Sequence, residues 1–470
     1  MRRPAFIAGL TSALLAPSAV RAAPGVLRTA TIHGLDDPDP YIGTTPLSPI
    51  IAWAYADGLV ATSTGGRIVP ALAASLPDRS ADGLVYRYTL RRDVRWHDGA
   101  QLRGQDVQTA FSRLSKRADL RSTPPFDTVA DIAATDHTIT VRLRRPFGAF
   151  VEQFFGPRGA LPLPLVRPGH IGTGPFQVQR VQPNISAVLT RAGGGPRGAA
   201  ALGELRIETI PDKNSLLVAY ESHEIDVAIY PPTETAAAYA KAGARIYRQD
   251  GTTLMILANC AAGPMADAAL RQAVFASIDR REIAHAAFGE WLQPSALLPE
   301  PRLPELTTAR ALLARTRPHL RIIATEGHPG QVALLVQQML QDAGASVEIV
   351  HISIPQFFSP DGPVHRGSYD LTLWFSDLAT PDLRPILGCR APQNVSGWCA
   401  PAFDALEASA AGTRGAASAT ALTHADALLN DAAPMLPLGR FQLAIASNPD
   451  VSLFVDEHAP LFMHVERWRT

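Results

Sequence analysis

Apolar and polar residues alternate in several short stretches of the first half of the chain. Tyr86, Tyr88 and Leu90 alternate with polar residues, and apolar positions continue to Trp96. This period of two is typical of a half-buried β-strand. Apolar residues then recur at helical spacing over 107–114, which predicts a helix directly after this strand. The same kind of pattern predicts further strands at 205–207, 225–229 and 254–258.

One segment in the second half carries the clearest pattern of the chain. An apolar run at 320–324 predicts a strand, and residues 332–343 place apolar side chains on one face of a helix. Gly344 stands where such a helix would stop, and 347–352 predicts the next strand. Short connections in this order imply a right-handed crossover and a parallel pair. With one more strand at 371–375, the fold class is α/β with parallel and mixed sheets.

Local signals mark where helices begin and where the chain turns. Asp267 and Asp279 each precede a helical pattern and are expected to cap it. The sequence His97-Asp98-Gly99 has side chains that could serve catalysis, but Asp-Gly is a turn signal, so a structural role is favoured. The glycines at 172–174 and 193–195 do not lie between a strand and a helix, as a phosphate-binding loop requires, and are interpreted as turns.

The first residues predict an export signal. Arg2 and Arg3 precede an apolar stretch at 5–16, and small residues surround a cleavage position at Ala22. The stretch is too short for a stable membrane span. Because this leader contains no cysteine, no lipid anchor is expected there. We therefore predict a signal peptide at 1–22 and a mature protein free in the periplasm.

Composition narrows the class of protein. The chain has 470 residues, of which 46% are hydrophobic and 18% charged, which is typical of a globular protein large enough for two or three lobes. Its 43 basic and 43 acidic residues cancel, so no general attraction to nucleic acid is expected. We also expect a monomer and no cofactor.

Three cysteines remain to be explained. Cys389 and Cys399 lie close in sequence, and an exported protein can form a disulfide between them. A metal site is the alternative for this pair, although neither a Cys-x-x-Cys motif nor clustered histidines support it. Cys260 ends an apolar strand and is expected to be a buried free thiol.

Six segments, taken in order, are similar to the motifs of the extracellular solute-binding proteins of family 5, which serve ABC importers of dipeptides, oligopeptides and nickel. The first contains the strand and the His-Asp-Gly turn described above, and together the segments extend over nearly the whole mature chain. They are Tyr88–Gly99, Gly172–Phe176, Glu224–Val227, Arg271–Arg280, Tyr369–Asp382 and Phe403–Pro437.

The resemblance implies two α/β lobes that are joined by a hinge and enclose the ligand between them. One lobe is discontinuous in sequence, and an additional subdomain is inserted near its start. The boundaries expected after the leader are 23–45, 170–255 and 437–470 for lobe I, 46–169 for the inserted subdomain, and 256–436 for lobe II.

The resemblance also implies a function and a set of ligand-binding residues. The protein would capture a dipeptide or oligopeptide and deliver it to the membrane permease. Asp377 follows Trp374 at the spacing at which the family binds the α-ammonium group of the peptide, and the backbone around Phe375 would pair with the peptide main chain. Asp382 is a second acidic candidate, and Trp398 could line the same pocket with Trp374.

Two departures from the family leave the ligand open. The stretch 191–202 is rich in Gly and Ala where the family usually has an aromatic pair. The region 328–337 has no Arg, although dipeptide binders hold the ligand carboxylate with an Arg near this place. A longer peptide, another small polar ligand, a nickel or other metal chelate, or haem are the alternatives within this class.

Other classes of function are also considered. A periplasmic sensor or chaperone could use the same two lobes without a permease. A secreted hydrolase is disfavoured, because the sequence contains neither Gly-x-Ser-x-Gly nor His-Glu-x-x-His. The 13 histidines lack metal-ligand spacing, so no direct metal site is expected.

Overall fold

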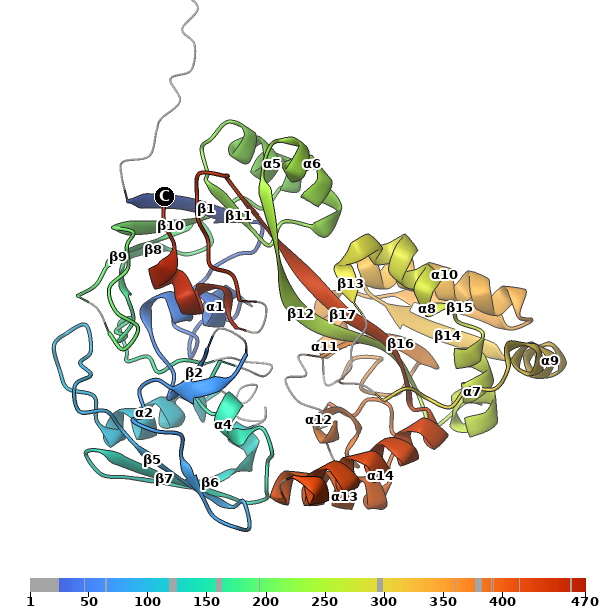
Figure 1. Ribbon diagram of the computed structural model, residues 1–470. Coiled ribbons are helices and arrows are strands. Elements are labelled where there is room, and N and C mark those ends of the chain that lie inside the picture. Colours follow the sequence, from blue (N-terminus) through green and yellow to red (C-terminus); the bar gives the residue numbers. More distant parts are fainter. Residues whose placement is uncertain are drawn as a thin grey trace, which may run out of the picture.

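The computed structural model describes most of the chain (Figure 1). The predicted signal peptide, Asp377 and Asp382 lie outside the described residues. The described residues are 25–45, 47–63, 66–117, 125–157, 163–193, 195–293, 299–359, 361–376, 383–389, 391, 393–413, 415–456 and 459–470.

Two long antiparallel strands, β12 (Arg245–Ala258) and β17 (Met435–Ser447), lie at the centre of an eleven-stranded sheet. The sheet order is β15-β14-β16-β12-β17-β11-β1-β10-β9-β8, and β13 (Leu292–Gln293) also pairs with β17. One half contains β11 (Val227–Ile229), β1 (Val26–Thr31), β10 (Glu204–Thr209), β9 (Ser186–Arg191) and β8 (Phe176–Gln182). The other half contains β16 (Leu371–Ser376), β14 (His319–Ala324) and β15 (Ser346–His351).

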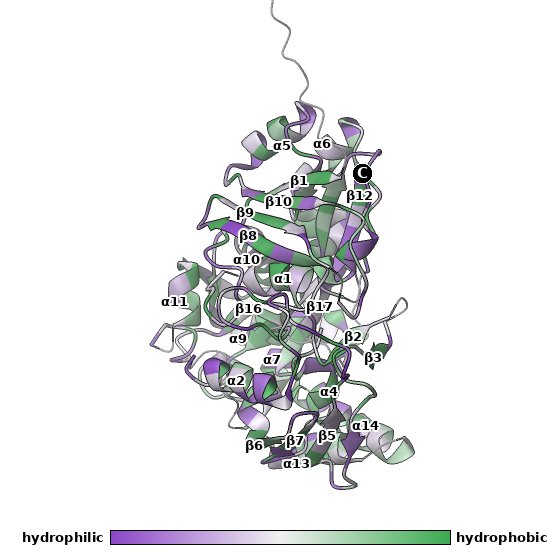
Figure 2. Cartoon of the chain, turned by 90° about the vertical axis from the view of Figure 1, so that its left-hand side faces the viewer, coloured by the Kyte–Doolittle hydropathy of each residue, from purple (hydrophilic) through white to green (hydrophobic). Residues whose placement is uncertain are grey.

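The half with β1 forms the sheet of lobe I. On one of its faces, Ala30 and Ala228 pack with the helices α5 (Lys213–Glu221) and α6 (Ala236–Lys241). On the other face, Leu205 and Ile207 join a larger core that includes α1 (Leu47–Tyr55) and the C-terminal 3₁₀ segment η6 (Leu461–Arg467). Figure 2 shows β8, β9 and β10 at the outer side of this lobe.

The inserted part has small sheets of its own. One has the order β4-β5-β7-β6 and the other pairs β2 with β3. The helix α2 (Gly104–Leu114) covers the predicted helical segment. The predicted strand ends earlier than expected, at Thr89, and Trp96 instead flanks the His97-Asp98 turn, where its backbone N–H donates to the carbonyl oxygen of Ala100. The remaining bounds are β2 (Val60–Thr62), β3 (Ile68–Pro70), β4 (Asp78–Arg79), β5 (Val85–Thr89), β6 (Val129–Ala134), β7 (Thr138–Leu143) and α4 (Phe150–Gln153).

Lobe II is a sheet covered on both faces. The predicted crossover unit is confirmed, since β14 and β15 are parallel and joined by α10 (His328–Asp342). The expected caps are also confirmed, since the carboxylates of Asp267 and Asp279 accept backbone N–H groups at the starts of two helices. One face carries α7 (Ala268–Ala276), α8 (Arg280–Ile283), α9 (Leu306–Thr316) and α10, and the other carries α11 (Ile354–Phe358), α12 (Arg384–Leu387), α13 (Pro401–Gly412) and α14 (Ala416–Ala432).

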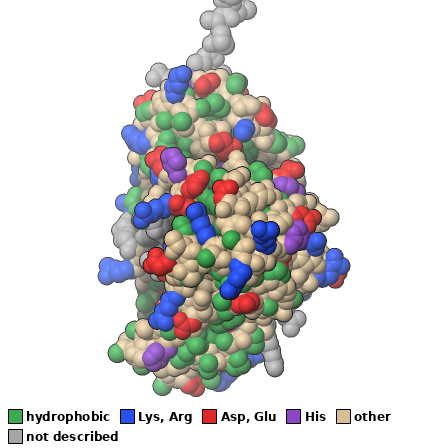
Figure 3. Space-filling view, turned by 90° about the vertical axis from the view of Figure 1, so that its right-hand side faces the viewer, with side chains coloured by type: hydrophobic (Ala, Val, Ile, Leu, Met, Phe, Trp, Pro, Cys, Tyr) green, Lys and Arg blue, Asp and Glu red, His purple; other side chains and the backbone are tan. Residues whose placement is uncertain are grey.

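The α/β class and the arrangement in two lobes follow the expectation from the sequence, while the exact domain boundaries stay a prediction. Among the described residues, no helix is both long and apolar enough to cross a bilayer. On the face drawn in Figure 3, basic and acidic side chains are interspersed, in line with the balanced charge of the chain.

Candidate functional site

The two lobes meet where β12 and β17 pass from one half of the sheet to the other. The pairing of these strands shifts register between Asp250 and Thr253 and again after Leu254. Such bulges bend a strand and increase its twist. A side chain at Gly251 would press on the carbonyl oxygen of Phe441, at 2.7 Å, so this bulge requires glycine. The junction therefore has the form expected of a hinge.

The end of β16 next to this hinge is paired on one side only. Its pairing with β12 continues to Ser376, but the pairing with β14 ends at Thr372 in the part of the chain that the structure describes. The stretch 373–376 thus has one edge of backbone N–H and C=O groups without a strand partner among those residues. An extended ligand chain can add to such an edge through main-chain hydrogen bonds.

Trp374 is buried beside this edge, with 4% of its surface exposed. Its ring packs against Phe357 and Phe358 of α11, with centroids 5.8 and 6.1 Å away. Among the described residues, its indole nitrogen has no hydrogen-bond partner, and neither has the buried hydroxyl of Thr253. Both side chains lie on the same face of the sheet, because Met255 pairs with Trp374 and Thr253 is two residues from Met255. Unpaired buried donors are unusual and call for an explanation.

The hinge also carries an ion pair. Arg440 pairs with Thr253 across the two strands, and its guanidinium donates to the carboxylate of Asp250 at 2.8 Å. Their side chains are 22% and 19% exposed. A pair at this depth is only partly screened by solvent and contributes modestly to stability. It places a positive and a negative group beside the buried Thr253 hydroxyl.

The aromatic residues predicted for the pocket do not all share one environment. Trp374 and Trp398 belong to one cluster, in which Trp398 is half-buried with its ring 5.2 Å from that of Phe403. Phe375 is half-buried in the cluster on the opposite face of the sheet. This follows from the strand period of two. The Phe375 side chain therefore faces away from Trp374, and the role predicted for Phe375 lies in its backbone. The predicted pocket role of Trp398 stays a prediction.

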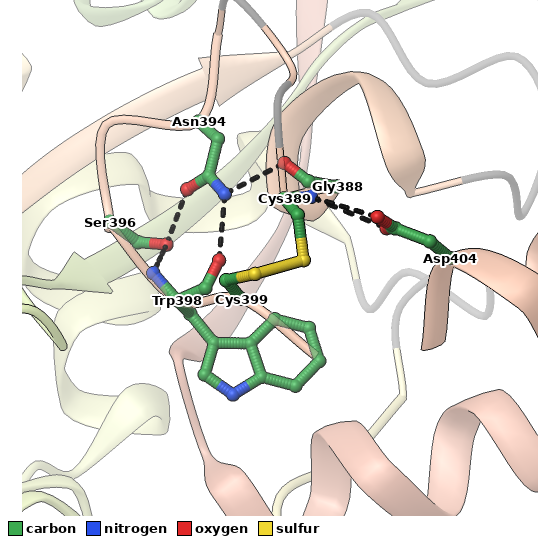
Figure 4. The surroundings of a disulfide bond; sticks show 7 residues. All are labelled: Gly388, Cys389, Asn394, Ser396, Trp398, Cys399 and Asp404. Atoms are coloured by element: carbon green, nitrogen blue, oxygen red, sulfur yellow. Dashed lines mark hydrogen bonds between the residues drawn. A yellow bond between two sulfur atoms is a disulfide. The ribbon is translucent and has the colours of Figure 1, made fainter. Parts of the chain in front are cut away.

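A disulfide joins Cys389 and Cys399, which lie ten residues apart. Figure 4 shows the loop that it closes. The Asn394 amide donates to the carbonyl oxygens of Gly388 and Trp398, at 2.9 and 2.8 Å, and so ties the two ends of this loop together. The indole of Trp398 points away from these bonds. A disulfide that closes a loop of this length stabilises the fold by roughly 2–3 kcal/mol, because it lowers the conformational entropy of the unfolded chain.

The remaining free thiol is a structural group. Cys260 is half-buried, and its backbone N–H donates to the carbonyl oxygen of Ser396 at 2.7 Å. Burial raises the pKa of its thiol to about 11. The thiol is therefore protonated, and unreactive as a nucleophile, near neutral pH.

The roles of Asp377 and Asp382 stay predictions, because both residues lie outside the described part of the chain. The neighbouring Ser376 ends the described strand, so Asp377 follows directly on the edge at 373–376.

The His97-Asp98-Gly99 turn is satisfied by the protein itself. The two ring nitrogens of His97 face the carbonyl oxygen of Gly174, at 3.0 Å, and the backbone N–H of Gly172, at 3.3 Å. Burial lowers the pKa of His97. The carboxylate of Asp98 pairs with Arg167 at 3.0 Å. These bonds support the structural interpretation of the motif.

Arg197 is a buried residue that the sequence reasoning missed. Its guanidinium donates to the carboxylate of Asp57, at 2.6 Å, and to the carbonyl oxygens of Trp53 and Met463. The two side chains are 10% and 2% exposed. Arg197 therefore ties α1 and the C-terminal segment to the stretch that departs from the family. The departure itself was the only signal in the sequence.

Three glycines near Arg197 that were predicted as turns lie where chain segments pass close to one another. A side chain at Gly172 would overlap the carbonyl oxygen of Tyr55, and one at Gly174 would lie 2.8 Å from the Arg197 guanidinium. A side chain at Gly195 would overlap the carbonyl oxygen of Thr173. Glycine is needed here because segments pass one another at backbone distance.

An open pocket of about 460 Å³ lies elsewhere, on the outer face of β8, β9 and β10. Arg180, Glu204 and Arg206 line it, and Glu204 pairs with Arg206. The pocket is shallow and charged, and it lies in lobe I rather than between the lobes. It is thus separate from the hinge strands β12 and β17. Within the described residues, no group of three or more His, Cys, Asp or Glu side chains could hold a metal ion.

Solved structures share the fold of this chain. The fold matches DppA from Helicobacter pylori in complex with peptide STSA, with a TM-score of 0.73, 20% identity, and coverage of 95% of this chain and 98% of DppA. It also matches NikZ from Campylobacter jejuni in complex with Ni(L-His), with a TM-score of 0.75, 16% identity, and coverage of 96% and 100%. The chain thus has the two-lobed fold of periplasmic binding proteins.

The family follows from the sequence comparison. The model for bacterial extracellular solute-binding proteins, family 5 (middle), matches residues 67–387, and the chain belongs to this family. Glutathione-binding protein GsiB from Salmonella choleraesuis is 27% identical over 275 residues, which are 55% of this chain and 52% of GsiB. The chain spans about half the length of the curated relatives that it matches. The expected resemblance is confirmed, and the family is one of binding proteins.

Proposed function

We propose that this protein captures a dipeptide or oligopeptide between its lobes and delivers it to the permease of an ABC importer. The observation that carries the proposal is the edge of β16 at 373–376, which has no strand partner beyond Thr372 on the side of β14 among the described residues. A peptide lying along this edge would pair with it as an added strand. Main-chain pairing gives affinity without selecting side chains.

The unpaired donors near the edge support the same kind of ligand. The Trp374 indole can only donate a hydrogen bond, and the Thr253 hydroxyl can donate one as well. A ligand that is rich in carbonyl or carboxylate oxygens would complement them after small movements of the covering chain. Asp377, which follows the edge in sequence, would bind the peptide ammonium group, and the charge-assisted bond would contribute about 1.5–3 kcal/mol.

The names of similar proteins fit this ligand class and also its alternatives. GsiB is named for glutathione, DppA was solved with peptide STSA, and NikZ with Ni(L-His). All three ligands contain amino-acid units. A metal chelate, haem, or a role as a periplasmic sensor or chaperone remains the second candidate. We further propose that the protein is exported by its leader, free of lipid, monomeric and without catalytic activity.

Native mass spectrometry on protein purified from a periplasm tests the proposal. A bound mass that leaves on unfolding and fragments as an intact peptide is expected. Rebinding of alanine peptides of two to five residues should then raise the melting temperature. An otherwise identical peptide with N-methylated amides, which cannot donate along the β16 edge, should bind more weakly. Binding of Ni(L-His) alone, or hydrolysis of the peptides, would contradict the proposal.

The Asp377→Ala variant tests the ammonium site. It should weaken binding of a free peptide but have little effect on an N-acetylated one, which carries no ammonium group. Equal losses for both peptides would show that Asp377 acts on the fold of the loop rather than on the ligand.

A further inference from the structure

The two lobes also touch at a place remote from the hinge. The guanidinium Nη2 of Arg79, in the inserted part, donates to the backbone carbonyl of Ala411 at 2.7 Å. These residues are 332 positions apart in the sequence. Figure 1 shows α13, which carries Ala411, next to the lower end of the inserted sheets, whereas β12 and β17 cross at the opposite side of the gap between the lobes.

The contact joins two separate bodies. The inserted part shares one continuous hydrophobic core with the sheet of lobe I, and this core contains Tyr86, Phe150 and Leu205. The helices α13 and α14 pack in a different cluster with Trp374 and Leu257. A rotation of lobe II about the hinge strands would therefore separate Arg79 from Ala411 without disrupting either core.

The hairpin formed by β4 and β5 positions the Arg79 side chain for this contact. Gly83, in the turn between β4 and β5, has a φ of +69°, and a side chain there would lie 2.5 Å from the Arg79 guanidinium. The turn is fixed by the Asp82 carboxylate, which accepts the Leu84 backbone N–H at 3.0 Å. The glycine thus leaves room for the guanidinium to lie along the hairpin.

The partner of Arg79 is well suited to a cation. Ala411 lies in the last turn of α13 (Pro401–Gly412), where carbonyl groups lack partners within the helix and carry a partial negative charge. Arg79 fills one of these positions. The neighbouring Ala410 carbonyl accepts the Ser418 hydroxyl at 2.9 Å. A rotation that moved the lobes apart would break the bond to Arg79 and leave the Ala411 carbonyl without this donor.

A close backbone approach accompanies the bond. A β-carbon added at Gly148 would lie 3.5 Å from the Ala411 α-carbon and 3.7 Å from its β-carbon. Gly412 in turn lies against the Pro146 ring. Small residues on both sides allow the surfaces to meet. We infer that Arg79 and the end of α13 form a latch that holds the closed form of the protein from the side opposite the hinge.

A cross-link tests whether this closed form occurs in solution. A distance of 3.7 Å between β-carbons suits a disulfide, for which the usual value is about 3.8 Å. The double variant Gly148→Cys/Ala411→Cys, in a Cys260→Ala background, should cross-link under mild oxidation with copper-phenanthroline. The control pair Gly148→Cys/Ala402→Cys should not, because Ala402 lies about 14 Å further along the helix. Equal, slow reaction of both pairs would overturn the latch.

Arg79 itself is tested by substitution. Arg79→Ala should slow the cross-link by about threefold to tenfold, Arg79→Lys less, and Arg87→Ala, on the neighbouring exposed strand position, not at all. Without ligand, small-angle X-ray scattering should show a larger radius of gyration for Arg79→Ala than for the wild type or Arg87→Ala. Identical rates and radii would overturn the role of Arg79. They would leave the proposed peptide binding untouched, because peptide affinity is measured separately.

Discussion

Two regions that look equally suited to chemistry differ in how their polar groups are satisfied. In the His97 turn, both ring nitrogens face backbone groups of Gly172 and Gly174. At the end of β16, the Trp374 indole and the Thr253 hydroxyl are buried and have no hydrogen-bond partner within the part of the chain that the structure describes. Because a buried polar group without a partner costs free energy, its persistence suggests a use. The contrast is between a turn whose polar groups are already satisfied and a strand end whose donors are available to a ligand.

The network behind the His97 turn should give the largest effect on stability. Arg197→Ala leaves the Asp57 carboxylate, 2% exposed, without its main partner. Loss of one member of a buried pair costs about 3–5 kcal/mol. Urea unfolding followed by circular dichroism measures this loss. Arg87→Ala, at an exposed position of β5, is the control and should change the free energy of unfolding by less than about 0.5 kcal/mol. A comparably small change for Arg197→Ala would show that the network is not structural.

Loss of the disulfide between Cys389 and Cys399, which closes the loop with Trp398, should have the second-largest effect on stability. The variant Cys389→Ser/Cys399→Ser should lower the free energy of unfolding by about 2–3 kcal/mol, because the unfolded chain gains freedom. Reduction of the wild type with dithiothreitol should lower it by a similar amount. If peptide binding survives in the folded variant, Trp398 acts in the core, as its contact with Phe403 suggests.

A comparison of Trp374→Phe with His97→Gln separates binding from architecture. Trp374→Phe keeps an aromatic ring against Phe357 but removes the indole N–H. Peptide affinity should therefore fall about fivefold to tenfold, which corresponds to the loss of one hydrogen bond. His97→Gln should lower stability and leave the affinity of the folded protein unchanged. Isothermal titration calorimetry with an alanine tripeptide, below the unfolding range of each variant, measures both affinities. If both variants lost affinity, the His97 turn could no longer be distinguished from the end of β16 as a purely structural region.

The sequence predicted correctly those features whose interacting residues are close together along the chain. The crossover unit around α10 and the caps at Asp267 and Asp279 were correct, because each signal and its partner lie within one turn or one helix. The contacts of Arg197 with Asp57 and Met463 join residues 140 and 266 positions apart, and no local pattern encodes them. The opposite orientation of the Trp374 and Phe375 side chains follows from the strand period, and it agrees with a role for Phe375 through its backbone rather than its side chain.

The smallest expected effect is the pH dependence that His97 contributes to stability. Burial lowers the pKa of His97 in the folded protein, whereas the unfolded chain has the ordinary value of about 6.5. Below about pH 6.5 the unfolded state therefore binds more protons, and stability falls as the pH falls. In His97→Gln, unfolding in urea at pH 7.5 and pH 5.5 should show a smaller loss than in the wild type. His33, whose pKa is lowered in the same way, is present in both proteins and cancels in this difference. An identical pH dependence in both proteins would mean that His97 is accessible to protons in the folded state, and the turn would then regain its place as a candidate site.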